Sequence, residues 1–256
     1  MPGLGDVLLL CLAAGFAGWI DAVSGGGGLV QLPALLILVP GAAPAAVLAT
    51  NKLSSIFGTS AAALTYHHRV RPDLLTALPM AAVALAGAAA GALSASVLSA
   101  DVFRPVVLVV LVLVGGYVLL RPTMGEEEAL RWTGGRHVGA ATGGALAIGF
   151  YDGILGPGTG SFLVILLVGL LGYSFLQASA KARIVNVATN LGALLVFVPQ
   201  GAPMWRTGLA MAACNLTGGW LGAHTAIRRG NRFVRLVFLV VVGGLVVRLG
   251  YDVARS

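Results

Sequence analysis

The sequence predicts an all-α protein that crosses a membrane several times. Apolar residues make up 58% of the 256 residues, charged residues only 10%, and the mean hydropathy is +0.94. A soluble domain carries about 25% charged residues, so this chain lacks the polar groups needed to cover a surface that faces water. In lipid every backbone polar group needs an internal partner, which favours helices, and the sequence has no alternating segments of the barrel type.

Three further features of the sequence argue against other classes. No Lys or Arg precedes the first apolar run, whereas a cleaved signal peptide begins with basic residues. Cys11 and Cys214 both lie inside apolar runs, so we expect no disulfide framework, no metal site and no cofactor. The formal charge of +7 comes from arginines scattered among short loops, which indicates membrane topology rather than binding of nucleic acid.

The apolar segments fall into two sets of five, separated by one polar stretch. The second segment of each set is shorter than the roughly 20 residues that a helix needs to span a bilayer. The polar stretch at 121–137 predicts a cytoplasmic linker between a first transmembrane repeat, 1–120, and a second, 138–256. The predicted segments are 4–23, 28–39, 43–65, 73–97, 105–120, 138–155, 158–171, 174–199, 207–226 and 234–250.

Similar residues recur at a nearly constant offset in residue number, which predicts an internal duplication. Asp21 and Gly25 recur as Asp152 and Gly156 at an offset of 131. The other matched sets are Lys52 with Lys181 (offset 129), Gly87 and Gly91 with Gly218 and Gly222 (131), and Gly115–Gly116 with Gly243–Gly244 (128).

The distribution of arginine predicts that the two repeats are inverted. The loop 67–73 has two arginines and its partner 200–206 has one, whereas 99–104 has one and its partner 228–235 has four. The positive-inside rule then places 67–73, the linker and 228–235 in the cytoplasm, which needs an odd number of crossings per half. Inverted repeats with interrupted segments at matching positions are typical of secondary transporters.

Glycine-rich breaks lie at the same place in both halves. They read SGGGGLVQLP after Asp21 and LGPGTGSF after Asp152. Unwound backbone at membrane depth survives only where protein or a water-filled cavity satisfies it, and the helix starts at such breaks suit a small anion. A tight turn between two spans, with glycines for close packing, is the alternative. The substrate-binding candidates at the breaks are Gly26, Gly27, Gly158 and Thr159.

Cationic side chains inside apolar segments predict a site for an oxyanion. The chain has two lysines, Lys52 and Lys181, and Arg183 lies two residues beyond the second. A charge at mid-bilayer costs at least about 2.5–3.5 kcal/mol and is rarely idle, although long side chains also reach the interface. Polar neighbours add hydrogen-bond donors, and three of them share one helix face by their spacing, Arg183, Asn186 and Asn190. The binding candidates among these neighbours are Thr50, Asn51, Ser55, Asn186 and Asn190.

Three roles compete for the two acids at the breaks, Asp21 and Asp152. They could pair with the lysines and keep the empty site neutral, carry a proton for coupling, or cap a helix start. The four histidines fit no zinc motif and are interpreted as interfacial residues. They are His67, His68, His137 and His224.

Two glycine patterns predict close helix packing, either within the chain or between protomers of a homodimer. They are the small-xxx-small pairs Gly87–Gly91 and Gly218–Gly222. No phosphate-binding loop, Ser-His-Asp arrangement or CxxC motif occurs, which argues against an enzyme. The stretch GTGSF departs from the Gly-x-Ser-x-Gly pattern of a nucleophile elbow.

Three stretches of the sequence resemble the sulfite exporter TauE/SafE family, in its bacterial branch of permeases. They are GFYDGILGPGTGSF at 149–162, ATNKLSSIFGT at 49–59 and the run 181–190. The resemblance covers nearly the whole chain. It implies a polytopic carrier of the inner membrane for small sulfur-containing anions, such as sulfite, sulfoacetate or related organosulfonates.

We therefore expect a secondary transporter that holds a small oxyanion between its two halves and works by alternating access. Lys52, Lys181 or Arg183 would bind the anion, and Asp21 or Asp152 would couple its movement to a proton or to the membrane potential. A passive anion channel is the alternative, distinguished by flux without saturation or counterflow. The expected partners are the anion and the lipid bilayer of a bacterial inner membrane, not nucleic acid.

Overall fold

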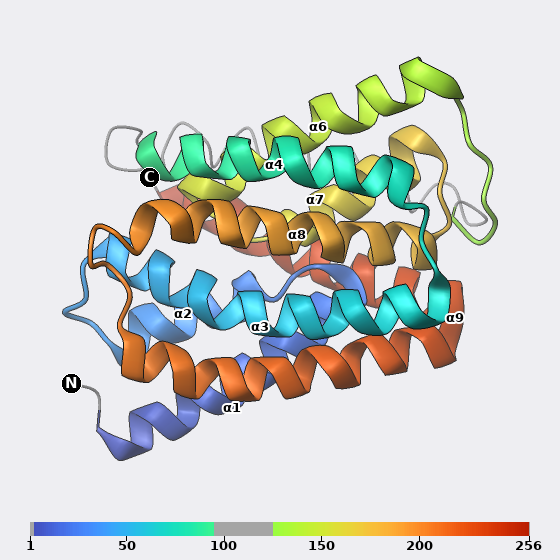
Figure 1. The fold of residues 1–256 in the computed structure, drawn as a ribbon. Coiled ribbons are helices and arrows are strands. Elements are labelled where there is room, and N and C mark those ends of the chain that lie inside the picture. The colour runs from blue at the N-terminus through green and yellow to red at the C-terminus, as the bar shows by residue number, and fades with distance from the viewer. Residues whose placement is uncertain (1–2, 95–124, 256) are drawn as a thin grey trace.

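The computed structural model describes residues 3–94 and 125–255, and every regular element within these ranges is helical (Figure 1). Three of the described helices are long and apolar enough to cross a membrane, namely α1 (Leu4–Ser24), α4 (Leu74–Ser94) and α8 (Phe175–Phe197). The other elements are α2 (Gly28–Leu38), α3 (Pro44–Val70), α6 (Gly134–Ile154), α7 (Thr159–Ile165), η1 (Leu166–Leu171) and α9 (Trp205–Arg255). The predicted all-α membrane class is confirmed.

The described elements occur in the same order in both halves. A long helix, a glycine-rich break, a short helix and two further long helices form α1 to α4 and recur as α6 to α9. The matching helices α3 and α8 lie side by side and antiparallel (Figure 1), because Gln177 bonds to Val70 near one end and Asn190 to Thr59 further along. The predicted segment 105–120 and the pair Gly115–Gly116 lie outside the described residues.

The helix α6 begins at Gly134, inside the stretch 121–137 that was predicted as the linker. His137 lies in the first turns of α6, and its side chain is buried within the protein. Its Nε2 atom is 2.8 Å from the hydroxyl oxygen of Tyr173. This contact anchors the start of α6 on the segment that precedes α8.

Glycines let two pairs of helices approach until their backbones touch. A Cβ atom on Gly218 of α9 would lie 1.9 Å from the carbonyl oxygen of Gly15 in α1. A Cβ atom on Gly91 of α4 would lie 2.1 Å from the carbonyl oxygen of Phe150 in α6. The close packing predicted for both glycine patterns is therefore confirmed, within the chain.

The two helix pairs make matching contacts. Gly18 packs on Asn215 where Gly149 packs on Ala84, and both sets of counterparts are related by the offset of 131. Contacts that recur at one offset support the predicted duplication, because unrelated packing would not keep a common register. The inverted repeat itself stays a prediction.

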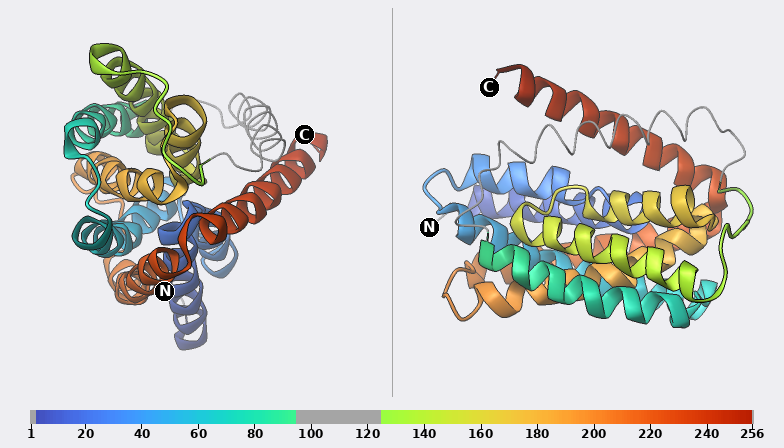
Figure 2. Two further views of the ribbon diagram at one scale, coloured as in Figure 1. Left: turned by 90° about the vertical axis from the view of Figure 1, so that its right-hand side faces the viewer. Right: turned by 90° about the horizontal axis from the view of Figure 1, so that it is seen from above.

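The long element α9 is interrupted at Gly230, where φ is 73° and ψ is −171°. This left-handed φ favours glycine, which has no Cβ atom to clash with the backbone. The predicted segments 207–226 and 234–250 fall on either side of this residue. Beyond it the helix turns back across the bundle (Figure 2).

Three arginine-bearing segments meet at one end of the bundle, as predicted. Asn231 donates to the carbonyl oxygen of Glu126 at 2.6 Å and accepts from the backbone N–H of Leu176 at 2.8 Å. Gln177 reaches the carbonyl oxygen of Val70 beside them. We call this the arginine-rich end; it holds Arg69, Arg71, Arg136, Arg228, Arg229 and Arg232. The opposite end, with the loops 39–43 and 198–204, is called the cleft end.

Candidate functional site

The two glycine-rich breaks touch each other inside the bundle. Ser161 donates its backbone N–H to the carbonyl oxygen of Gly25 and its hydroxyl to that of Ser24, both at 3.1 Å. Gly25 has a φ of 93°, and a Cβ atom there would lie 2.1 Å from the backbone of Gly160. The breaks therefore satisfy part of each other's backbone, and glycine is needed where they meet.

A small polar cavity lies beside this contact. Its volume of about 20 Å³ offers room for about one water molecule. Most of the binding candidates line it, and its five glycines include two that were not named from the sequence, Gly28 and Gly160. The lining residues are Asp21, Gly25, Gly28, Asn51, Lys52, Ser55, Asp152, Gly156, Gly158, Thr159, Gly160, Asn186 and Asn190.

A first buried ion pair joins the two halves across this cavity. The Nζ atom of Lys52 in α3 lies 2.5 Å from Oδ2 of Asp152 in α6, and these side chains are only 3% and 2% exposed. Oδ1 of Asp152 accepts a hydrogen bond of 2.5 Å from the hydroxyl of Thr159 at the start of α7. Asp152 thus holds both sides of its own break while it neutralises a cation from the other half.

A second buried ion pair crosses between the halves in the opposite sense. Nη1 of Arg183 in α8 lies 2.9 Å from Oδ2 of Asp21 in α1, and it also donates to the backbone carbonyl oxygen of Asp21. The Arg183 side chain is fully buried. Within the described ranges its Nε and Nη2 atoms have no hydrogen-bond partner. These atoms are spare donors beside the break, because a Cβ atom on Gly160 would lie 2.8 Å from Nη2.

The two ion pairs are equivalent in the duplication. Asp21 corresponds to Asp152 at the offset of 131, and Lys52 corresponds to Arg183 at the same offset. The counterpart of Lys52 is therefore Arg183 and not Lys181, which corrects the match made from the sequence. The capping role proposed for the acids is wrong, because neither α2 nor α7 has a side-chain cap at its start. Both acids lie near the C-terminal ends of α1 and α6.

Lys181 lies outside the cavity, toward the arginine-rich end. Its Nζ atom donates to the carbonyl oxygen of Asp73 at 3.1 Å, lies 3.7 Å from Oδ2 of Asp73 and sits 4.5 Å from the ring centroid of Tyr173. Its counterpart at an offset of 131 is Thr50, whose hydroxyl accepts from the backbone N–H of Met204 at 3.0 Å. Asp73 and Met204 are related by the same offset, so Lys181 and Thr50 tether corresponding loops at opposite ends.

The contacts of Asp73 change the pKa of its carboxyl group. Partial burial alone would raise the pKa of Asp73. Hydrogen bonds from the Thr76 hydroxyl and the Leu75 backbone, together with the charge of Lys181, outweigh burial and lower that pKa below its ordinary value. Asp73 therefore stays charged and keeps its pairing with Lys181 down to acidic pH.

Three other candidates, Arg183, Gly26 and Gly27, also lie outside the cavity lining. A Cβ atom on Gly26 would lie 2.2 Å from the side chain of Val241, and one on Gly27 would lie 2.5 Å from the carbonyl oxygen of Ala17. These glycines permit close packing of the break against α1 and α9, which is the packing alternative weighed for the breaks. The side of the break that faces the cavity is formed by Gly25 and Gly28.

Sequence reasoning missed an amide cluster next to the cavity, formed by Gln31, Asn51 and Asn215. The side chain of Asn215 donates to Oε1 of Gln31 at 2.8 Å, and Gln31 donates to the backbone carbonyl oxygen of Asn51 at 3.3 Å. All three side chains are buried. Isolated amides in apolar segments were the available signal, since a buried amide needs partners.

Buried charges that pair across two halves of a helical membrane protein, around a cavity at broken helices, are typical of transporters. Comparison with known proteins agrees with this class. The family model described as "Sulfite exporter TauE/SafE" matches residues 10–249, and the chain belongs to this family.

Curated relatives cover nearly the full length of the chain. A "Probable membrane transporter protein ORF9" of Sinorhizobium sp. is 38% identical over 95% of this chain and 92% of its own. The "Probable membrane transporter protein YfcA" of Escherichia coli strain K12 is 34% identical over 95% of this chain and 89% of its own. A "Probable membrane transporter protein" of Haemophilus influenzae is 31% identical over 96% of both chains. No solved structure matches the chain.

Proposed function

We propose that this chain is a secondary transporter of small anions, sulfur oxyanions or organosulfonates of the sulfite and sulfoacetate type, in a bacterial inner membrane. The observation that carries the proposal is the pair of equivalent ion pairs that join the two halves beside one polar cavity, Lys52–Asp152 and Arg183–Asp21. Lys52, Asp152 and Asp21 line this cavity. The description of the family as sulfite exporters supports the sulfur-containing class of substrate.

The chemistry of the cations supports an anionic substrate. Arg183 keeps two buried nitrogen donors, Nε and Nη2, without a partner among the described residues. The planar fork of a guanidinium can donate to two oxygens of an oxyanion at once. Lys52 adds a point charge to the cavity lining. Asn186, Asn190 and Ser55 add hydroxyl and amide groups to the lining, which suit oxygens that do not face a cation.

Substrate binding requires the halves to move apart. A cavity of about 20 Å³ has room for about one water molecule, so an anion of several heavy atoms needs a larger site. Two equivalent ion pairs related by an inverted repeat would let one half rock on the other between states of similar energy, which is the basis of alternating access. In this proposal the present arrangement corresponds to an occluded state.

Charge balance supports coupling to a proton. Each buried cation is already neutralised by a carboxylate, so an entering anion would leave the site with net negative charge. A net charge in the membrane interior is costly, and protonation of Asp21 or Asp152 would remove it. Each charge carried by the substrate would then travel with one proton.

Thermal unfolding of the purified protein with sulfite, sulfoacetate and thiosulfate tests this function. A ligand that binds the folded state raises the melting temperature as its concentration rises. We expect this shift for the wild type and for Lys181→Ala, which lies outside the cavity, and its loss in Lys52→Ala and Arg183→Ala. Equal shifts in all four proteins, or no shift with any anion, would overturn the proposal.

A passive anion channel is tested by transport in liposomes. A transporter exchanges labelled internal anion for unlabelled external anion and saturates with concentration, whereas a channel shows neither behaviour. We expect saturable counterflow. Flux that rises linearly with concentration would identify the channel.

A further inference from the structure

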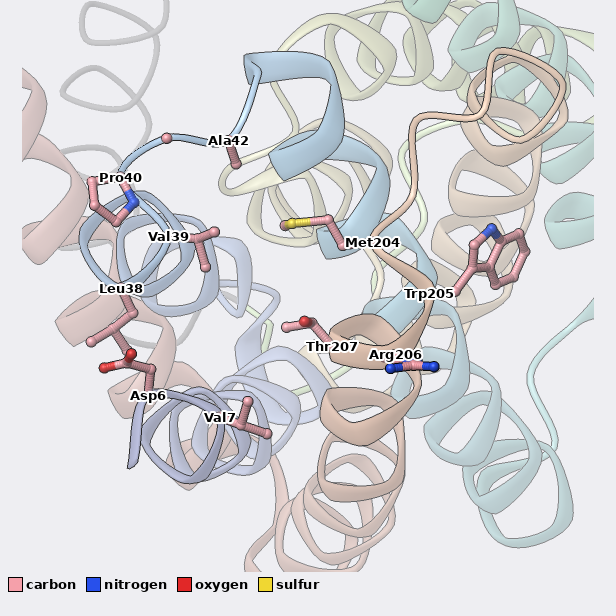
Figure 3. A pocket seen from close by; sticks show the side chains of 11 residues that line it. Asp6, Val7, Leu38, Val39, Pro40, Ala42, Met204, Trp205, Arg206 and Thr207 are labelled. Carbon is pink, nitrogen blue, oxygen red and sulfur yellow. The ribbon is translucent and has the colours of Figure 1, made fainter. Parts of the chain in front are cut away.

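The outer surface has a large cleft that reaches into the bundle from the cleft end. Its volume is about 1080 Å³, and it lies between the start of α1, the end of α2 and the start of α9. Figure 3 shows Val7, Val39, Met204 and Thr207 pointing toward the hollow, whereas Trp205 points away from it. The lining also includes Arg206, an exposed cation at the mouth.

Between this cleft and the central cavity lies one apolar layer. The layer is a separate small core cluster, which we call the apolar plug, and its residues are Leu10, Ala14, Leu32, Leu35, Val47 and Met211. Each contributing helix runs from the cleft through the plug toward the cavity. In α2, for example, Leu38 lines the cleft, Leu35 and Leu32 belong to the plug, and Gly28 lines the cavity.

The amide cluster of Gln31, Asn51 and Asn215 lies on the cavity side of this plug. It draws α2, α3 and α9 together, because Gln31 bonds at once to Asn215 and to the backbone of Asn51. Asn51 also lines the cavity, and its Oδ1 atom has no hydrogen-bond partner in the described parts of the chain. The cluster therefore offers polar groups to anything that enters from the cleft.

The arginine-rich end has no such polar layer at the equivalent positions. The counterparts of Gln31, Asn51 and Asn215 at an offset of 131 are Phe162, Ala182 and Ala84. All three lie in the main hydrophobic core. The two halves therefore differ at this layer. The positions between the cleft and the cavity carry amide side chains, whereas their counterparts toward the arginine-rich end are apolar.

We propose that the amide cluster and the apolar plug form the outer gate of the permeation path, which runs from the cleft between α2 and the start of α9 to the central cavity. The proposal rests on the transport function proposed above and assigns that path. Gln31 holds the gate closed, because its two hydrogen bonds join α2 to α3 and to α9. Breaking both bonds allows α2 to move away from these helices. A small anion passes the layer by exchanging those bonds for its own.

The test measures access to the cavity with a small anionic thiol reagent, sulfonatoethyl methanethiosulfonate, and no substrate. A reporter cysteine replaces Ser55 in a full-length chain whose Cys11 and Cys214 are replaced by alanine. Gly41→Cys in a parallel protein marks the cleft end, because Gly41 is an exposed loop residue with open space around it. Right-side-out and inside-out vesicles then show which side reaches the reporter.

Gln31→Met keeps the length of the side chain but cannot make either bond. We expect it to raise the labelling rate of the reporter about tenfold from the side that labels Gly41→Cys, because two hydrogen bonds hold the gate closed. Asn215→Ala, which removes the same contact from the other partner, should act alike if the first variant folds poorly. Phe162→Leu, at the counterpart of Gln31, is the matched control and should leave labelling from that side unchanged.

Three results would overturn the gate. These are an unchanged rate in folded Gln31→Met and Asn215→Ala, an equal increase in Phe162→Leu, or access from the other side alone. The outcome is separable from that of the proposed function. If anions bind but the Gln31 variant does not change the labelling rate, only the gate is refuted. If the labelling rate changes but no anion binds, only the transport of these anions is refuted.

Discussion

Lys52 and Arg183 occupy corresponding positions in the two halves of the chain, and each pairs with an aspartate of the opposite half. Both side chains come from the long helix that follows the short broken one, and both reach an acid at the end of the first helix of the other half. The two halves are therefore joined through the site itself. Any rearrangement of the site must break or exchange these bonds.

The identity of each ion pair predicts a specific pattern of stability. Lys52→Met leaves Asp152 buried without its cation and should lower the free energy of unfolding by about 3–5 kcal/mol. The matched double variant, Lys52→Met with Asp152→Leu, should recover most of that loss. The mismatched double variant, Lys52→Met with Asp21→Leu, strands both Asp152 and Arg183 and should be the least stable. Unfolding in detergent measures all three, and equal stability of the two double variants would contradict the pairing.

The position of Lys181 predicts a structural and not a ligand-binding role. Lys181→Ala should lower the melting temperature less than Lys52→Ala does, because the partner Asp73 is 44% exposed and keeps contact with water. Any shift caused by anions should persist in Lys181→Ala. A normal melting temperature combined with a lost response to anions would instead place Lys181 in the binding site.

The lowered pKa of Asp73 predicts a dependence of stability on pH. A group whose pKa is lower in the folded chain stabilises it fully above the unfolded pKa, about 3.9 for aspartate, and loses this effect as pH falls through the folded value. The wild type should therefore melt above Asp73→Asn at neutral pH. The difference should shrink as the pH falls below the ordinary pKa of aspartate, because Asp73 takes up a proton there. Thermal melts over this range check the sign, and a gap that grows in acid would contradict it.

The contact between α1 and α9 predicts that adding one methyl group at Gly218 destabilises the protein. Gly218→Ala would place Cβ against the Gly15 carbonyl and should cost about 1–3 kcal/mol as the helices separate. Gly139→Ala is the matched control, because Gly139 is a helical glycine of α6 with nothing within 4 Å of its Cβ position. That control should be neutral or stabilising, since alanine favours helix by up to about 1 kcal/mol. Equal effects at both positions would exclude the close packing.

The central site was predictable in part. Four of the residues expected at the cavity line it, namely Lys52, Asn51, Asp152 and Thr159. Polar and charged side chains are rare in apolar segments, and they face the interior of the bundle or a cavity rather than lipid. The match of Lys52 with Lys181 was wrong. It used residue type and an offset of 129, whereas the packed helices keep an offset of 131. Two residues turn an α-helix by about 200°, so Lys181 faces away from the position that Arg183 occupies.

The sequence by itself determined the membrane class, the two sets of helices, their glycine-rich breaks and the acids beside them. These features follow from composition and local backbone chemistry, which act over a few residues. Only the tertiary structure decided which cation pairs with which acid, and that Gln31 and Asn215 meet between the cleft and the cavity. Such partners belong to helices far apart in the chain and are brought together by the phase of each helix and by the glycine contacts between helices.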